Sequence, residues 1–187
     1  EAYNVISVGL IRLGRYQEAI QLLENTVRRF PNNSDLQLQL AVAYINRGDL
    51  KTGRNILHQT AKVDPRNPQI YLKIGQIMQE QEDLEGALQA YEKAVSLNSN
   101  SVEAQARIGE ILLVQEKYMM AVVIYRRVLE LIPQNPGAYY NLGLALKGRN
   151  RRKEAIKVVK KARKLYLSLD DIQGVQQAEA LLEQLKK

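Results

Sequence analysis

Apolar residues recur along this chain at spacings of three and four, and the pattern returns at a fixed period of 34 residues. Small residues share one position of the period: Ala19, Gly53, Ala87, Ala121 and Ala155. Apolar residues share another: Ile6, Leu40, Ile74, Ile108 and Leu142. Such spacings are typical of amphipathic helices, and a fixed period of this size is typical of stacked repeats. The pattern predicts an all-α array in which each unit packs against its neighbours.

Each unit is predicted to hold two helices joined by a tight turn. One position of the period stands where the first helix should end: Gly14, Gly48, Glu82, Glu116 and Asn150. Glycine and asparagine favour the left-handed backbone that often ends a helix, so the two glutamates are departures. Asn67-Pro68 and Asn135-Pro136 predict helix starts, with an N-cap followed by proline in the first turn.

At the repeat positions, the third and fifth units show a common motif: Tyr71, Ile74-Gly75, Met78, Ala87 and Tyr91, then Tyr139, Leu142-Gly143, Leu146 and Ala155. On these residues the chain resembles the tetratricopeptide repeat (TPR) family, whose unit carries an aromatic residue, Leu-Gly, Tyr, then Ala, an aromatic residue and Pro. The resemblance covers residues 1–169. It implies a right-handed superhelix (α-solenoid) of about five helix-turn-helix hairpins plus a C-terminal capping helix, acting as a protein-binding scaffold.

The repeat boundaries predict a single array over residues 1–187: units 1–33, 34–67, 68–101, 102–135 and 136–169, then a capping helix over 170–187. Five apolar residues of that last helix are expected to cover the final repeat: Ile172, Val175, Leu181, Leu182 and Leu185. Arg152 and Arg163 stand where earlier units are apolar. The fifth unit is therefore expected to meet solvent or a different neighbour.

By the same resemblance, the first helices of the units line a concave groove that binds a peptide or helix of a protein partner. The groove residues are expected to be Leu38, Gln39, Val42, Ile45, Leu72, Lys73, Gln76, Arg107, Glu110, Tyr140, Asn141 and Leu144. Lys73 and Arg107 predict an acidic group on the ligand between two apolar ends. In the alternative interpretation, Arg107 only pairs with Glu103 or Glu110 on its own helix.

The family also contains adaptors that clamp the C-terminal carboxylate of chaperone tails. The corresponding places in this chain hold Leu38, Val42, Lys73, Glu103 and Arg107. Only Arg107 fits the clamp, so a chaperone-tail adaptor is disfavoured.

Positive charge is concentrated in the fifth unit of a chain whose formal net charge is +7. Residues 136–169 contain ten Lys and Arg and one acidic residue, Glu154. A basic patch is expected at Lys153, Lys157, Lys160, Lys161 and Lys164. Such a patch serves either as a solvated end of the array or as a docking site for an anionic membrane surface or an acidic protein. Nucleic acid is not expected, because no nucleic-acid motif accompanies the charge.

A homo-oligomerising array is a further alternative to the function as a scaffold for other proteins.

The composition argues against an enzyme. The chain has one histidine, His58, which is expected on a helix surface, and no cysteine, so no Ser-His-Asp set, no Cys-His set and no multi-histidine metal site is expected. No cofactor or metal site is predicted. The longest apolar run, residues 118–125, is assigned to the core of a repeat helix and is shorter than a membrane span.

Glu1 opens the sequence inside the first predicted helix, without an initiator Met or a leading cap. We therefore expect an excised domain of a longer protein, whose compartment the sequence does not identify.

Overall fold

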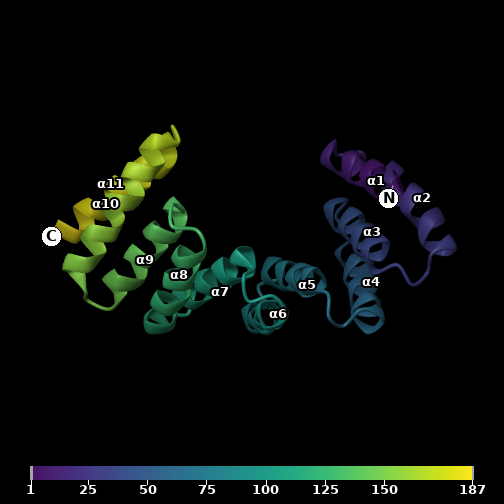
Figure 1. Ribbon diagram of the computed structural model, residues 1–187, viewed down its shortest axis with the longest axis horizontal. Helices are drawn as coiled ribbons and strands as arrows, with labels where there is room; N and C mark the ends of the chain where they lie inside the picture. Colours follow the sequence, from purple (N-terminus) through teal and green to yellow (C-terminus); the bar gives the residue numbers. More distant parts are fainter. Residues whose placement is uncertain (1, 187) are drawn as a thin grey trace. The chain divides into compact units, whose positions relative to one another are not determined.

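The computed structural model describes residues 2–186, which form eleven α-helices and no strand (Figure 1). The helices are α1 (Ala2–Arg12), α2 (Tyr16–Arg29), α3 (Ser34–Asn46), α4 (Leu50–Val63), α5 (Pro68–Glu80), α6 (Leu84–Leu97), α7 (Val102–Val114), α8 (Tyr118–Leu131), α9 (Pro136–Gly148), α10 (Arg152–Ser168) and α11 (Ile172–Lys186). Consecutive helices pack as helix-turn-helix hairpins, and α11 packs on α10. The predicted all-α fold of hairpins followed by a last helix is confirmed.

The helices gather into two compact units, Glu1–Asn98 and Ser99–Lys187, which we call the N-terminal and C-terminal units. The N-terminal unit contains α1 to α6, drawn from purple to teal in Figure 1. The C-terminal unit contains α7 to α11, drawn from teal to yellow. The single array over residues 1–187 stays a prediction.

A left-handed residue follows the first helix of every hairpin. The φ angles are 73° at Gly14, 97° at Gly48, 62° at Glu82, 56° at Glu116 and 57° at Asn150. The next N–H then bonds to the carbonyl five residues earlier, as Asp83 N does to Met78 O at 2.9 Å, which is the bond of a Schellman motif. The predicted turn is present in all five hairpins. Both glutamates adopt it, although a side chain disfavours this conformation by about 1–2 kcal/mol.

The predicted helix starts at α5 and α9 are also confirmed. Asn67 Oδ1 accepts the N–H of Gln69 at 3.0 Å, and Asn135 Oδ1 accepts that of Ala138 at 2.9 Å. Each cap satisfies one of the N–H groups that the first turn leaves unpaired. These caps fix where the first helix of the third and fifth hairpins begins.

Small residues let the two helices of a hairpin approach closely. Ala87 and Ala155 are fully buried where their helices pack against α5 and α9. On the first helices of the third and fourth hairpins, a Cβ added at Gly75 would lie 2.6 Å from the ring of Tyr91, and one added at Gly109 would lie 2.6 Å from the ring of Tyr125. The glycines therefore seat aromatic rings of the partner helix, which the repeat pattern alone did not specify.

The closing helix α11 covers α10 with four of the five predicted residues. Leu181 and Leu185 are buried, as expected, and Val175 and Leu182 are half-buried. Ile172 is 72% exposed, so its predicted role is wrong. The helix instead begins its contact at Gly174, which fits against the ring of Tyr166. Ile172 lies two residues before Gly174, about 200° away around the helix, and so points away from α10.

Candidate protein-interaction surfaces

In the N-terminal unit, the predicted groove residues lie on α3 and α5, and all but one of them are half-buried. Leu38 and Ile45 are half-buried and pack against the core cluster that includes Leu57 and Ile74. Leu72 is only 3% exposed. Leu72 therefore serves the core, which corrects its predicted place on the ligand-facing surface. Val42 and Gln76 are half-buried and keep part of their side chains at the surface, together with Gln39 and Lys73.

In the C-terminal unit, the predicted groove residues lie on α7 and α9. Tyr140, Asn141 and Leu144 are all half-buried on α9, at spacings that place them on one side of the helix. Arg107 and Glu110 are half-buried on α7. The C-terminal unit thus presents two partly exposed apolar side chains with an amide between them.

Several polar residues among or beside the predicted groove residues already have hydrogen-bond partners within their own unit. Ser7 Oγ donates to Gln39 Oε1, and Lys73 Nζ donates to Gln76 Oε1 at 2.8 Å. Arg107 Nη1 donates to Glu110 Oε2 at 3.0 Å, so the alternative interpretation of Arg107 describes the structure. An ion pair on one helix face contributes about 0.2–0.5 kcal/mol, which a ligand carboxylate could replace. The acidic group expected between Lys73 and Arg107 stays a prediction, because the two residues belong to different units.

Tyr125 of α8 reaches toward the same side of the C-terminal unit from within the core. The side chain is 1% exposed, and among the described residues its hydroxyl makes no hydrogen bond of normal geometry. Burial raises the pKa of Tyr125 above its usual range, Glu110 adds to the rise, and the nearby Asn141 amide opposes it. By contrast, the hydroxyl of Tyr91 donates to Gln79 Oε1 at 2.9 Å. Tyr125 stays a neutral phenol at physiological pH.

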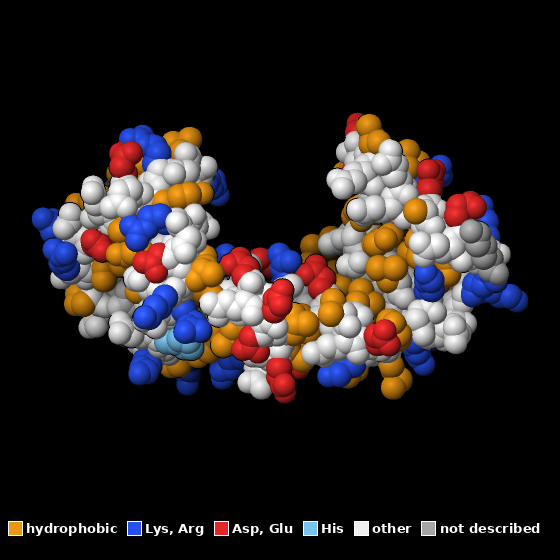
Figure 2. Space-filling view, turned by 180° about the vertical axis from the view of Figure 1, so that it is seen from behind, with side chains coloured by type: hydrophobic (Ala, Val, Ile, Leu, Met, Phe, Trp, Pro, Cys, Tyr) orange, Lys and Arg blue, Asp and Glu red, His pale blue; other side chains and the backbone are white. Residues whose placement is uncertain are grey.

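The five lysines of the predicted basic patch are all exposed on α10. Two arginines near them are paired: Arg151 with Glu154 at 2.6 Å and Arg163 with Glu179 of α11 at 2.7 Å. Arg163 therefore meets a different neighbour, as expected for this apolar repeat position. The lysines form no ion pair within the described residues, and the ammonium of Lys161 lies 4.5 Å from the ring centre of Tyr139. Figure 2 shows Lys and Arg side chains of the C-terminal unit (right in this view) among acidic and uncharged ones on the drawn face.

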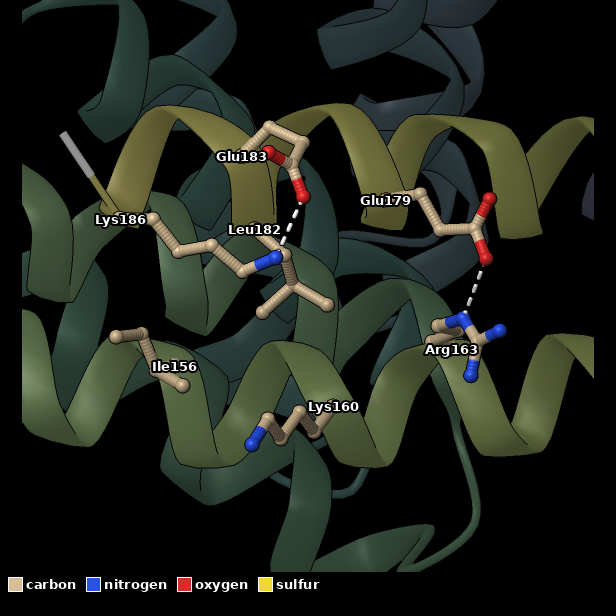
Figure 3. A pocket seen from close by; sticks show the side chains of 7 residues that line it. All are labelled: Ile156, Lys160, Arg163, Glu179, Leu182, Glu183 and Lys186. Atoms are coloured by element: carbon tan, nitrogen blue, oxygen red, sulfur yellow. Dashed lines mark hydrogen bonds and ion pairs between the residues drawn. The ribbon is translucent and has the colours of Figure 1, made fainter.

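Three of the five lysines line two separate grooves. One groove, of about 820 Å³, runs between α10 and α11 and is lined by Lys160 together with the apolar Ile156 and Leu182 (Figure 3). Two ion pairs also line it, Arg163 of α10 with Glu179 of α11 and Lys186 with Glu183 within α11. Lys157 and Lys161 lie on another groove, between α8, α9 and α10. The predicted patch is thus not one continuous surface, because its lysines line different grooves along α10.

An exposed apolar surface on α8 was missed in the sequence. Met119, Met120 and Val123 are 63%, 53% and 63% exposed, so the assignment of the whole 118–125 run to the core is wrong. Ala121 and Tyr125 of the same run are buried. Since the run is apolar on all sides of the helix, its periodicity could not separate the buried face from the exposed one.

No helix within residues 2–186 is both long and apolar enough to cross a bilayer. His58 is exposed on α4. In the same residues, no three His, Asp or Glu side chains come together as metal ligands would.

Paired helices with this spacing, turn and packing define a helical repeat protein. Models of the tetratricopeptide repeat match residues 10–77, 68–101 and 136–171, and a TPR repeat model matches residues 109–148. The chain belongs to the tetratricopeptide repeat family.

Known proteins agree with this assignment. A TPR repeat-containing protein of Picosynechococcus sp. is 38% identical over 55 residues, which are 29% of this chain and 14% of that protein. The chain thus matches only a small part of that relative's length. MamA superposes with a TM-score of 0.78 at 23% identity, covering 89% of this chain and 97% of that one.

Two further solved structures share the fold. PilF of Pseudomonas aeruginosa has a TM-score of 0.78 at 18% identity, covering 98% of this chain and 90% of that one. YrrB, described as a TPR protein with an unusual peptide-binding site, has a TM-score of 0.75 at 18% identity, covering 95% and 90%. At these identities the likeness shows the fold alone.

Proposed function

We propose that this chain is a non-catalytic scaffold that binds a peptide or helix of a partner protein along the first helices of its hairpins. Membership of the tetratricopeptide repeat family supports a protein-interaction scaffold in general. One structural neighbour, YrrB, is described as having a peptide-binding site. The fold leaves the choice of ligand to the side chains on its surface.

The observation that carries this proposal is the face of α9. Tyr140 and Leu144 are partly exposed apolar side chains one turn apart, and the amide of Asn141 lies beside them. An aromatic anchor next to a polar group is typical of the centre of a protein interface. On α3, Val42 and Gln39 offer a smaller surface of the same kind. Each unit thus offers apolar side chains on its first helices together with a charged residue, Lys73 in one and Arg107 in the other, which suits a segment that carries both apolar anchors and an acidic group.

The test is capture of a partner with the intact chain as bait, followed by affinity measurement for the captured partner. Reversal of both central charges, Lys73→Glu with Arg107→Glu, should weaken binding by about 1.5–3 kcal/mol, the contribution of hydrogen bonds to charged groups. Lys51→Glu with Lys117→Glu is the matched control, because both lysines are exposed near the starts of second helices. Undiminished binding by the first variant would place the partner elsewhere.

The basic helix α10 supports a second candidate, docking to an anionic membrane or an acidic complex. The supporting observation is the set of lysines on α10 that no carboxylate of the described residues neutralises. Retention on vesicles containing phosphatidylglycerol, lost at high salt, would favour a membrane. A doubled mass in light scattering would favour the homo-oligomer instead.

A further inference from the structure

A pocket of about 380 Å³ lies between α8, α9 and α10, away from the proposed peptide-binding side chains of α9. Leu142 and Leu146 of α9 form its floor and are 4% and 1% exposed. Tyr139 and Val158 are half-buried at its walls. The pocket is therefore apolar at its base and large enough to admit one side chain of a ligand.

The rim of the same pocket is cationic. Arg126, Lys157 and Lys161 line it, and Glu154 is its one acidic lining residue. Glu154 is already held by Arg151 at 2.6 Å and by Arg126 at 3.9 Å. The ammonium groups of Lys157 and Lys161 are thus left without a carboxylate among the described residues, although Lys161 lies over the ring of Tyr139.

We propose that this pocket, lined by α8, α9 and α10, binds an acidic segment of a protein partner. One apolar side chain of the segment enters between Tyr139 and Val158, and flanking carboxylates pair with Lys157 and Lys161. Charge complementarity selects the acidic partner, because the rim carries two unneutralised cations over an apolar base. A bilayer surface fits less well, since a membrane meets a flat or convex basic face and cannot fill a pocket.

The groove between α10 and α11 lacks this property although it is larger. Its Arg163 and Lys186 are paired with Glu179 and Glu183, which leaves Lys160 as its one lining cation without a carboxylate, against two in the pocket beside α9 (Figure 3). The repeat-equivalent positions in the N-terminal unit differ as well. The N-terminal unit retains the lysine–tyrosine contact, because the ammonium of Lys93 lies 5.9 Å from the ring centre of Tyr71. His58 and Gln89, however, stand in place of Arg126 and Lys157.

The test uses a dye-labelled acidic peptide in which a single Phe is flanked on both sides by Glu, and fluorescence anisotropy at low salt. Lys157→Gln with Lys161→Gln should raise the dissociation constant about tenfold, the loss expected for two charge pairs at a partly exposed rim. Lys160→Gln with Lys164→Gln removes the same charge from exposed positions on the same helix outside the pocket. This control variant should change the dissociation constant by less than about twofold. Peptides with Gln for Glu, or Ala for Phe, should each bind more weakly.

Three results would overturn the proposal. Equal losses in the two lysine variants would mean a general attraction to α10 without a pocket. Equal binding of the Phe and Ala peptides would mean that the apolar base is not used. Failure of the unmodified chain to bind the acidic peptide, with retention on phosphatidylglycerol vesicles, would assign the lysines to a membrane surface.

Discussion

The hairpins α5–α6 and α9–α10 have the same frame and carry opposite charge. Both begin with an Asn-Pro cap, place a glycine of the first helix against a buried side chain of the second, and turn through a left-handed residue. Yet α6 carries one Lys and two Glu, whereas α10 carries seven Lys and Arg and one Glu. The frame depends on buried packing positions and on the local geometry of caps and turns, so the other exposed positions are free to differ. In this chain, specificity therefore belongs to the exposed positions of each hairpin.

The two hairpins also differ in what packs on their second helix. Within the C-terminal unit, α10 is covered by α11, which buries Leu181 and pairs Glu179 with Arg163. This cover is the largest structural addition to the common frame. It explains why Arg163 tolerates a position that is apolar in earlier repeats.

Truncation of Leu181 tests the importance of that cover and should have the largest effect. Leu181→Ala removes a side chain that is 2% exposed and should lower the free energy of unfolding by about 2–5 kcal/mol. Ile172→Ala on the same helix is the control. Because Ile172 is 72% exposed, this substitution should change the free energy of unfolding by less than about 0.5 kcal/mol. Urea denaturation followed by circular dichroism measures both. Similar losses in the two variants would mean that α11 packs with another face.

Much of the frame could be predicted from the sequence, because the period reports buried and conformationally restricted positions. The shared turn at Gly48 and Glu82 and the caps at Asn67 and Asn135 depend only on local geometry, so a single sequence was enough to place them. Burial of a whole helix face, by contrast, depends on which neighbours cover it. The sequence therefore could not show that Leu72 is buried.

The candidate sites were predicted less well than the frame, for physical reasons. Arg107 lies within reach of Glu110 on its own helix, and spacing alone could not decide between that carboxylate and a ligand. The exposed surface at Met119 and Val123 lies in a run that is apolar on every side, so no polar face marked it. The pocket beside Tyr139 and Lys157 joins three helices and becomes visible only when they are packed.

The turn residue offers a smaller test of the common frame. Glu82 and Asn150 occupy the same left-handed position, with φ of 62° and 57°. Glu82→Gly should raise the free energy of unfolding by about 1 kcal/mol, because glycine adopts this backbone without steric strain. Asn150→Gly should gain less, since asparagine already tolerates the conformation. Denaturant midpoints of the two variants decide the point, and a larger gain at Asn150 would mean that side-chain contacts at Glu82 offset its strain.

The last test moves the charge of one hairpin onto the other. His58→Arg with Gln89→Lys gives the N-terminal unit the cations that Arg126 and Lys157 supply in the C-terminal one. The native pocket is first disabled by Lys157→Gln with Lys161→Gln. On this background the acidic Phe peptide should bind a few-fold more tightly after the transfer, because each exposed charge pair contributes about 0.2–1 kcal/mol. The same transfer with His58→Gln and Gln89→Ser is the neutral control. If the transfer leaves the peptide's affinity unchanged, the shape of the pocket beside α9 decides binding. The charge difference between the hairpins would then not be sufficient for peptide binding.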